Sequence, residues 1–348
     1  MSQYPPELRR YARQMIHPQI GETGQRALGA ARVLIVGCGA LGTHIADTLA
    51  RAGVGFLRIV DRDFVELHNL QRQVLFDEDD LQTGAPKALA ATAKLRRINS
   101  SITIEPIVDD ANAANIAALI AGIDLIVDGT DNFETRYLLN DAAARAGLPW
   151  IYGGVLASYG MTLTILPGET ACLRCLFPEP PPPGAAPTCD TAGVLAPAVA
   201  LIAAIEAAEA LKILTGARDA TSRELLAFDV WRLTVDRLPA HRQADCPTCG
   251  DGPHSYPFLD PATASRSVSL CGRNAVQITL AHPPTFALAG LAERLAAAGS
   301  VRHNEHLLRF RPAEGEQELV IFPNGRTIVH GTDDTALARV LYARYVGL

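Results

Sequence analysis

The segment Gly37-Cys38-Gly39-Ala40-Leu41-Gly42 constrains the fold of this chain more than any other feature of the sequence. It follows an apolar run and opens a helical pattern. Glycines at this spacing allow a tight turn and the close approach of a nucleotide, and a helix N-terminus favours an anionic phosphate. Asp61 ends the next apolar run, where a carboxylate can bind ribose hydroxyls. Alone, this pattern leaves open a dinucleotide site, a site for another nucleotide, or a purely structural turn.

Apolar segments alternate with helical patterns through the first half of the chain. The sequence predicts buried strands at residues 32–37, 56–61, 102–107 and 124–128. It predicts helices that begin near Ala40, Pro86, Ala113 and Asn132. Near-continuous apolar strands between helices are typical of βαβ units. The predicted fold class is therefore α/β, with a doubly wound, Rossmann-like and mostly parallel sheet that residues 149–153 and 161–166 extend.

The length of 348 residues favours about two domains. We predict a first domain over residues 1–250, which includes a proline-rich crossover at 178–187. A helix at 194–214 is apolar on more than one face, so it is either a core helix or one that a second copy of the chain partly buries. Residues 255–348 predict a small α+β domain of unknown role. Its expected elements are a strand at 276–280, a helix at 286–297, hairpin strands at 307–310 and 318–322, a turn at Asn324-Gly325 and a helix at 335–345.

The net charge of -6 and the isoelectric point near 5.9 argue against a nucleic-acid partner and against binding to an anionic membrane surface. The N-terminal residues carry no apolar leader pattern, and the longest uncharged run, at 191–205, is too short to span a bilayer. We therefore expect a cytoplasmic protein without a membrane partner. In that compartment, seven cysteines favour metal ligands or reactive thiols over a disulfide framework.

Basic residues in this chain are mostly arginines, and only three of the 31 are lysines. Lys87 is one of the three. It follows Pro86 at the predicted start of a helix, where a cation opposes the helix macrodipole. An anionic partner would offset this repulsion, and Arg72 supplies a second cation upstream. Together the two side chains suggest a triphosphate site, and the alternative for Lys87 is a solvated surface lysine.

Asp131 follows the predicted strand at 124–128, at the sheet edge where open α/β sheets bind their ligands. A carboxylate that faces phosphates is well placed to hold Mg²⁺, which usually takes one or two carboxylates plus substrate oxygens. The alternative role of Asp131 is the N-cap of the next helix, for which Asp131 and Asn132 are both suited.

The cysteines at 172, 175, 246 and 249 form two Cys-x-x-Cys pairs. Each pair can bind one metal through two thiolates, and two pairs complete the four-cysteine site of structural zinc. A redox dithiol and unligated thiols are the alternatives. The zinc interpretation involves all of Cys172, Cys175, Cys246 and Cys249 and leaves no open position for catalysis by the metal.

Cys189 lies between the proline-rich segment and the long helix. A nearby helix N-terminus would lower its pKa, so we interpret it either as a reactive thiol or as a small loop residue without a role. Cys38 and Cys271 are interpreted as packing residues.

These motifs occur in an order that resembles the MoeB/ThiF family of adenylyltransferases, relatives of the ubiquitin-activating enzymes, and ThiF in particular. They are residues 10–14, 37–42, 61–63, 69–73, 86–87, 129–132 and the two cysteine pairs. The resemblance covers residues 4–250. It implies an enzyme that uses MgATP to adenylate the C-terminal glycine of a small ubiquitin-like sulfur-carrier protein ending in Gly-Gly. Pyrophosphate would leave, and the carrier would be ready for thiocarboxylate formation.

The resemblance also implies roles for individual residues. Asp61 would bind ribose, Arg72 and Lys87 the phosphates, and Asp131 the Mg²⁺. Arg13 would reach into the neighbouring subunit's site as an arginine finger, which makes a homodimer the active unit. Cys189 would bond to the activated carrier terminus. The implied nucleotide-binding set is Gly37, Gly39, Gly42, Asp61, Asp63, Asn69, Arg72, Gln73, Lys87, Asp131 and Asn132.

A ThiS-like carrier, serving thiamine thiazole synthesis, is the first hypothesis for the substrate. A MoaD-like carrier, serving molybdopterin synthesis or tRNA thiolation, is the alternative. The C-terminal domain is not convincingly a rhodanese domain, so a separate protein is expected to donate the sulfur. Other classes left open are a NAD-dependent oxidoreductase, a dehydratase of a modified tRNA base and a non-catalytic carrier-binding module. The oxidoreductase would leave Arg72, Lys87 and Asp131 without a partner.

Overall fold

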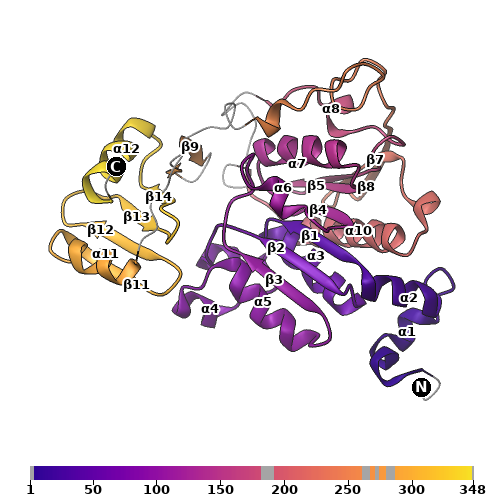
Figure 1. Ribbon diagram of the computed structural model, residues 1–348, viewed down its shortest axis with the longest axis horizontal. Coiled ribbons are helices and arrows are strands. Elements are labelled where there is room, and N and C mark those ends of the chain that lie inside the picture. Colours follow the sequence, from indigo (N-terminus) through magenta and orange to yellow (C-terminus); the bar gives the residue numbers. More distant parts are fainter. Residues whose placement is uncertain (1–3, 182–191, 261–266, 271–273, 280–286, 347–348) are drawn as a thin grey trace. The chain divides into compact units, whose positions relative to one another are not determined.

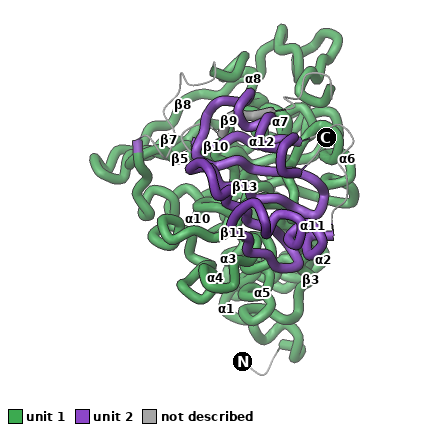
Figure 2. Tube along the Cα trace, turned by 90° about the vertical axis from the view of Figure 1, so that its left-hand side faces the viewer, with its two compact units in different colours: residues 1–181, 193–263 green, residues 182–192, 264–348 purple. Residues whose placement is uncertain are grey.

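The computed structural model describes residues 4–181, 192–260, 267–270, 274–279 and 287–346. They form two compact units (Figure 2), of which the first contains the chain up to residue 181 together with 193–263. The second unit contains the C-terminal part of the chain. Cys189, Cys271 and the proline-rich segment beyond residue 181 lie outside the described residues.

The first unit is built on an eight-stranded sheet (Figure 1). Its strands are β1 (Arg32–Val36), β2 (Phe56–Val60), β3 (Thr103–Ile107), β4 (Leu125–Asp128), β5 (Trp150–Leu156), β6 (Tyr159–Ile165), β7 (Glu224–Asp229) and β8 (Thr234–Pro239). The spatial order is β3-β2-β1-β4-β5-β6-β7-β8. Strands β1 to β5 pair in parallel, whereas β6, β7 and β8 continue the sheet with antiparallel pairs. The sheet is therefore parallel from β3 to β5 and continues with antiparallel strands after β5.

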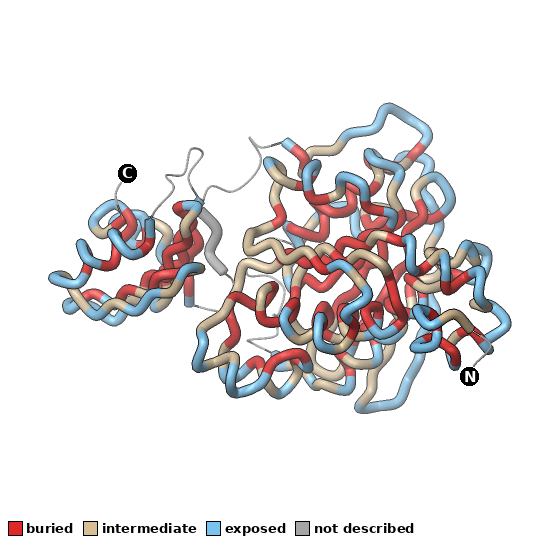
Figure 3. Tube along the Cα trace, turned by 60° about the horizontal axis from the view of Figure 1, so that its bottom comes forward, coloured by how far each residue is buried: buried red, intermediate tan, exposed pale blue. Residues whose placement is uncertain are grey.

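Helices cover both faces of this sheet. One face buries apolar side chains of α3 (Ala40–Ala52), α5 (Lys87–Ile98) and α10 (Ala196–Leu214), and the other those of α6 (Ile116–Leu119) and α7 (Phe133–Ala146). Figure 3 shows buried residues running through the centre of the unit. The remaining helices are α1 (Ala12–Met15), α2 (Gly21–Ala30), α4 (Glu78–Thr83) and α8 (Leu173–Leu176), with 3-10 turns η1 (Pro6–Tyr11), η2 (Leu67–Asn69), η3 (Arg218–Ala220) and η4 (Pro257–Leu259). This architecture confirms the predicted doubly wound α/β class.

The predicted strands and helices of this unit are found within a few residues of their expected limits. Helix α10 occupies the predicted long apolar helix, and its buried side chains confirm that it belongs to the core. The prediction missed β7 and β8, and it also missed the helices before β1. None of the helices in the described part of the chain has the length and hydropathy needed to cross a membrane.

The second unit is an antiparallel sheet with two helices, which confirms the predicted α+β character of the C-terminal part. Its strands are β9 (Ser267–Leu270), β10 (Ala275–Ile278), β11 (Gly299–His303), β12 (Leu308–Pro312), β13 (Glu318–Ile321) and β14 (Thr327–His330), in the order β11-β12-β13-β14-β10-β9. Helices α11 (Leu288–Leu295) and α12 (Thr335–Tyr345) bury apolar side chains against it. Gly325, with a φ of +78°, forms the predicted turn between β13 and β14.

Candidate nucleotide site and four-cysteine centre

The glycine loop after β1 packs against the loop after β4. Val36 pairs with Asp128 in the sheet, so residues 37 and 129 are neighbours at its carboxyl edge. Gly37 has a φ of +89°, and a Cβ there would lie 2.5 Å from the carbonyl oxygen of Gly129. A Cβ at Gly42 or at Gly129 would overlap the carbonyl oxygen of Gly37. Only glycine at these three positions allows the two loops and the start of α3 to meet.

Asp61 fastens the glycine loop to the segment that follows β2. Its Oδ2 accepts a hydrogen bond from the backbone N of Cys38 at 2.6 Å, and its Oδ1 accepts one from the backbone N of Asp63 at 2.7 Å. Burial raises the pKa of the Asp61 carboxyl, and the positive charge of Lys87 opposes that shift. Both carboxylate oxygens therefore hold backbone, a structural role in addition to the ribose contact that the resemblance implies. Cys38 is fully buried, which confirms its interpretation as a packing residue.

Lys87 occupies the first position of α5, and its side chain is 5% exposed. Its backbone N donates to the carbonyl oxygen of Asp63 at 2.8 Å, and its Nζ lies 3.4 Å from Asp63 Oδ2. The charge of Lys87 acts on both Asp61 and Cys38, so the ammonium group lies beside the glycine loop. The alternative of a solvated surface lysine is therefore wrong.

Residues 69–73 bring one polar side chain to the glycine loop. Gln73 is 3% exposed, and its Nε2 lies 3.8 Å from the place that a Cβ on Gly39 would take. Its Oε1 is buried and has no hydrogen-bond partner among the described residues. Asn69 Oδ1 accepts a hydrogen bond from the backbone N of Glu66 at 3.0 Å. Arg72 is partly exposed and donates to the carbonyl oxygen of His68 at 2.7 Å, which holds it against its own turn.

Arg136, which the sequence analysis did not single out, organises the loop between β4 and α7. Its Nε donates to Asp128 Oδ2 at 3.3 Å, and its Nη2 donates to the carbonyl oxygens of Thr130 at 2.9 Å and Gly153 at 3.0 Å. Asp128 is fully buried; burial raises the pKa of its carboxyl, and the charge of Arg136 opposes that shift. This buried ion pair joins the first turns of α7 to the β4 loop and to β5.

Asp131 is exposed in the same loop. Asn132, and not Asp131, caps α7, because Asn132 Oδ1 accepts a hydrogen bond from the backbone N of Thr135 at 2.9 Å. The N-cap alternative for Asp131 is therefore wrong. An exposed carboxylate at the carboxyl edge of the sheet is compatible with a ligand of Mg²⁺.

The four predicted cysteine ligands come together in the first unit. Their sulfur atoms all lie within 4.8 Å of one another. The Sγ atoms of Cys172 and Cys246 are 3.6 Å apart, and those of Cys175 and Cys249 are 3.4 Å apart. Tetrahedral zinc with Zn–S bonds of about 2.3 Å requires sulfur atoms about 3.8 Å apart. The donors and their spacing therefore fit one zinc ion, as the sequence predicts.

Arg13 lies at the opposite edge of the sheet from the glycine loop. Its neighbour Gln14 donates through Nε2 to the carbonyl oxygen of Ala52 at 2.9 Å, and Ala52 is the last residue of α3. The glycine loop precedes the first residue of that 13-residue helix, and a helix of this length spans about 20 Å. Arg13 is exposed and cannot reach the glycine loop of its own chain.

Glu206 on α10 is a buried acid for which the sequence analysis predicts no role. It is fully buried, and neither carboxyl oxygen has a hydrogen-bond partner among the described residues. Its Oε2 lies 2.5 Å from the place that a Cβ on Gly153 would take. The Glu206 carboxyl group therefore occupies the space beside Gly153 of β5, where a larger residue would place its side chain. Burial raises the pKa of Glu206 well above its usual value, and the negative charge of Asp128 adds to the shift.

Glu206→Gln is expected to raise the Tm at pH 8 by about 2 °C or more and to leave it nearly unchanged near pH 4.5. The pKa of Glu206 in the folded protein lies above the ordinary value of 4.5, so the folded state binds the proton more tightly than the unfolded state. This acid therefore costs stability as the pH rises above about 4.5, and glutamine removes the cost. Calorimetry at the two pH values measures the difference.

Glu209, one turn further along α10, is the matched control for this measurement. It is also buried, but it accepts hydrogen bonds from Thr164, Ser222 and Lys212. Glu209→Gln should therefore lower the Tm at pH 8. A shift of equal size at both pH values in Glu206→Gln would contradict the assignment of Glu206 as a buried protonated acid.

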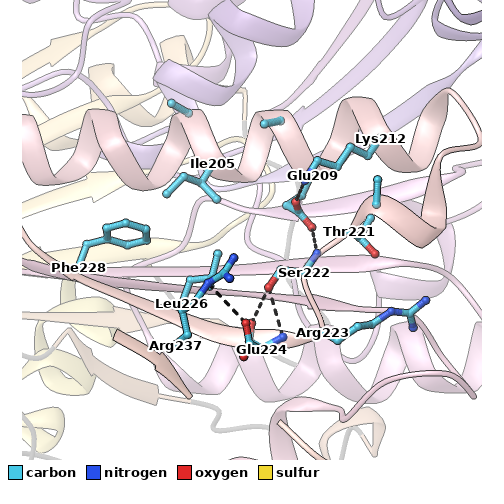
Figure 4. A pocket seen from close by; sticks show the side chains of 13 residues that line it. Ile205, Glu209, Lys212, Thr221, Ser222, Arg223, Glu224, Leu226, Phe228 and Arg237 are labelled. Carbon is cyan, nitrogen blue, oxygen red and sulfur yellow. Dashed lines mark hydrogen bonds and ion pairs between the residues drawn. The ribbon is translucent and has the colours of Figure 1, made fainter. Parts of the chain in front are cut away.

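A cavity of about 620 Å³ opens between α10 and the β7–β8 pair (Figure 4). Glu209, Lys212, Ser222 and Arg237 line its polar side, and Ile205, Leu226 and Phe228 line its apolar side. None of the predicted site residues lines this cavity. The sequence-predicted site is instead the edge formed by the glycine loop, the start of α5 and the β4 loop.

The fold and this edge define a Rossmann-like α/β protein in which a glycine loop, a buried lysine and a four-cysteine centre share one unit. The chain belongs to the ThiF family, whose model matches residues 11–248.

Named relatives extend this match. A sulfur carrier protein ThiS adenylyltransferase of Bacillus subtilis is 43% identical over 341 residues, which cover 97% of this chain and 99% of that protein. A SAMP-activating enzyme E1 of Haloferax volcanii is 41% identical over 246 residues, which cover 71% of this chain and 90% of that protein. A crystal structure of E. coli MccB with ATP has a TM-score of 0.62 at 26% identity and covers 71% of this chain and 76% of that one.

Proposed function

We propose that this chain uses MgATP to adenylate the C-terminal glycine carboxylate of a ubiquitin-like sulfur-carrier protein, with a ThiS-like carrier as the substrate. The observation that carries this proposal is the 43% identity with the Bacillus subtilis ThiS adenylyltransferase, because it extends over 97% of this chain and 99% of that protein. The relatives named SAMP-activating enzyme E1 and sulfur carrier protein adenylyltransferase support the same chemistry. A MoaD-like carrier is the alternative substrate.

The charges around the glycine loop suit this reaction. A carboxylate that attacks the α-phosphate of ATP meets like charge, and nearby cations offset the repulsion while holding the reactants in line. The ammonium group of Lys87 has three N–H donors, and its ion pair with Asp63 leaves donors for phosphate oxygens. Arg72 supplies a second cation from the preceding segment. The reaction requires no general base, because the glycine carboxylate is already ionised at neutral pH.

Two polar groups at this edge support a nucleotide in the same place. Gln73 reaches Gly39 with its Nε2, and its Oε1 is a buried acceptor for which a nucleotide hydroxyl or amino group would supply the donor that the described residues do not. We propose Asp131 as the ligand of Mg²⁺, which supplies charge neutralisation to the phosphates when bound. Asp61, Asp63, Asn69 and Asn132 complete the proposed nucleotide-binding set, although each already holds part of the protein.

Mass spectrometry of candidate carriers tests the proposed function. The protein is incubated with MgATP and with a ThiS-like or a MoaD-like carrier, and the spectra are searched for a carrier that has gained one AMP. A second adduct, between the carrier and the protein, would identify Cys189 as the proposed acceptor thiol if Cys189→Ser abolishes it. Exchange of pyrophosphate into ATP that needs no carrier would contradict the proposal, and so would tight binding of NAD without binding of ATP.

We also propose that the active unit is a homodimer in which Arg13 of one subunit serves the site of the other. Arg13 is next to Gln14, which contacts the end of α3, and the glycine loop lies at the other end of that helix of about 20 Å; this position supports action on a second copy. Exposed apolar side chains at the start of α10 and around β8 offer an interface: Leu195, the residue before the helix, and Leu201, Trp231, Leu233, Val235 and Leu238. An exposed apolar patch of this kind is typical of a protein–protein interface.

Mixing two inactive variants tests this arrangement. Arg13→Ala and Lys87→Ala should each abolish most of the adenylation, and a mixture that has exchanged subunits should regain up to about a quarter of the normal rate. Half of the dimers are then mixed, and one of their two sites combines an intact Lys87 with an intact Arg13. The rate is measured as AMP transfer to the carrier. Mixing with the double variant serves as the control, and no recovery in the first mixture would contradict action between subunits.

A further inference from the structure

Helix α7 carries two adjacent side chains that hold the two cysteine loops. Asn140 Oδ1 accepts a hydrogen bond from the backbone N of Leu173 at 2.8 Å. Asp141 Oδ1 accepts one from the hydroxyl of Thr248 at 3.1 Å, and Asp141 Oδ2 accepts one from the backbone N of Phe258 at 3.1 Å. Asn140 is 1% exposed and Asp141 is fully buried. These are therefore enclosed contacts, in which a lost partner leaves a polar group without water.

Two of these three contacts fall within the cysteine loops themselves. Leu173 lies between Cys172 and Cys175, and Thr248 lies between Cys246 and Cys249. Each Cys-x-x-Cys loop is thus held by one side chain of α7. Arg174 NH1 also donates to the hydroxyl of Thr248 at 3.2 Å, which joins the two loops to each other. The same face of α7 holds the chain beyond the first pair, because the Tyr137 hydroxyl donates to the carbonyl oxygen of Phe177 at 2.7 Å.

The start of α7 holds the loop that carries Asp131. Arg136 binds Asp128, Thr130 and Gly153 from a position that is 7% exposed. Arg136 and Asn140 are four residues apart, so they lie on one face of the helix about 6 Å apart along its axis. Arg136, which holds the β4 loop, and Asn140, which holds the first cysteine loop, are therefore one helical turn apart on the same buried face of α7.

We propose that α7 couples the four-cysteine centre to the loop that carries Asp131, with Asn140 and Asp141 as the positioning residues that keep the cysteine loops ready for zinc. Groups that orient the ligands of a metal raise its affinity, and their loss typically costs about 10- to 100-fold. When zinc is bound, the two cysteine loops are fixed to each other and to α7. The contacts of Arg136 then hold the β4 loop to the same helix. The part of the inference that concerns Asp131 rests on the proposed function; the part that concerns zinc does not.

Zinc release from the purified full-length protein to a chromogenic chelator tests the positioning role. Asp141→Asn should release zinc about tenfold faster or more, because an amide cannot accept both hydrogen bonds. Thr248→Val removes one hydroxyl and should accelerate release in the same direction, which keeps the test available if Asp141→Asn does not fold. Thr92→Val is the matched control, because Thr92 is a buried threonine on α5 whose hydroxyl donates to the carbonyl oxygen of Ala88 in its own helix and to no other of the described residues. Its zinc release rate should equal that of the wild type. Wild-type release in a folded Thr248→Val protein would overturn the positioning role, as would wild-type protein purified without zinc.

Hydrogen exchange with and without zinc tests the coupling. Removal of zinc should increase exchange in residues 128–136 and in the cysteine loops, while α5, on the other face of the sheet, keeps its protection. Asp141→Asn should show part of the same increase with zinc present. Unchanged exchange at 128–136 would overturn the coupling, and an equal increase in α5 would do so too, because it would indicate global unfolding. Both readouts are independent of adenylation, so a carrier that gains no AMP would leave the zinc result standing.

Discussion

Lys87→Ala is expected to lower carrier-dependent adenylation by about 100- to 1000-fold while the protein remains folded and keeps its oligomeric state. Lys87 is the most deeply buried cation of the predicted phosphate set, and its charge acts on the glycine loop through Asp61 and Cys38. Its removal takes away the buried cation that we propose offsets the charge of the phosphates. Asp63 retains Arg62, whose Nε lies 3.8 Å from Asp63 Oδ1, so the fold tolerates the change. The initial rate of AMP transfer to the carrier measures the effect.

Lys94, on the same helix α5, is the control for this experiment. It forms ion pairs with Asp77 and Asp80 and was not predicted to bind ligand. Lys94→Ala removes a paired lysine of the same helix, and adenylation should stay within about twofold of the wild type, because neither Lys94 nor its partners Asp77 and Asp80 belong to the proposed site. Normal adenylation by Lys87→Ala would contradict the proposed role of Lys87 at the phosphates.

Gly37→Ala should abolish detectable ATP binding and lower the Tm by several degrees. A side chain there adopts a left-handed φ of +89° and brings a Cβ within 2.5 Å of the Gly129 carbonyl oxygen. Left-handed backbone alone costs about 1–2 kcal/mol for a residue other than glycine, and the contact with backbone must also be relieved by separating the two loops. Calorimetric titration with MgATP and thermal unfolding measure the two consequences.

Gly147→Ala is the control that separates the cost of a left-handed φ from the cost of the contact with Gly129. Gly147 ends α7 with a φ of +68°, but a Cβ there would meet no atom within 4 Å among the residues described. Gly147→Ala should therefore show the left-handed penalty alone, with a smaller loss in Tm and normal ATP binding. If Gly37→Ala behaves like Gly147→Ala, the contact between the glycine loop and the β4 loop does not support the nucleotide site.

The sequence predicts those features that depend on residues close together in the chain. The β1 strand, the glycine loop and the start of α3 are adjacent, and their pattern is sufficient to place them at one edge of a parallel sheet. The two cysteine pairs are far apart in the sequence. Two such pairs nevertheless predict one four-thiolate metal site, and the structure brings the four cysteines together. The hairpin at Asn324-Gly325 follows equally from a local preference for positive φ.

The sequence does not reveal contacts that tertiary packing creates. Arg136 looks like any charged residue of a helix, and only the register of β4 with β5 gives its guanidinium three oxygen partners. The meaning of Glu206 depends on Gly153, from which it is separated by 53 residues in sequence. Strand β8 was missed because it is exposed along its whole length and carries no pattern of burial. The position of Arg13 at the far edge also depends on how the first helices pack beneath α3.

The close packing of Gly37, Gly42 and Gly129 against one another limits how this protein can be engineered. A side chain added to the glycine loop or to the β4 loop at one of these positions must shift the other loop, since a Cβ at any of these glycines would overlap the backbone of another. A change of nucleotide preference is therefore better sought at Gly39 and Gln73, where the backbone of the loop has space beside it.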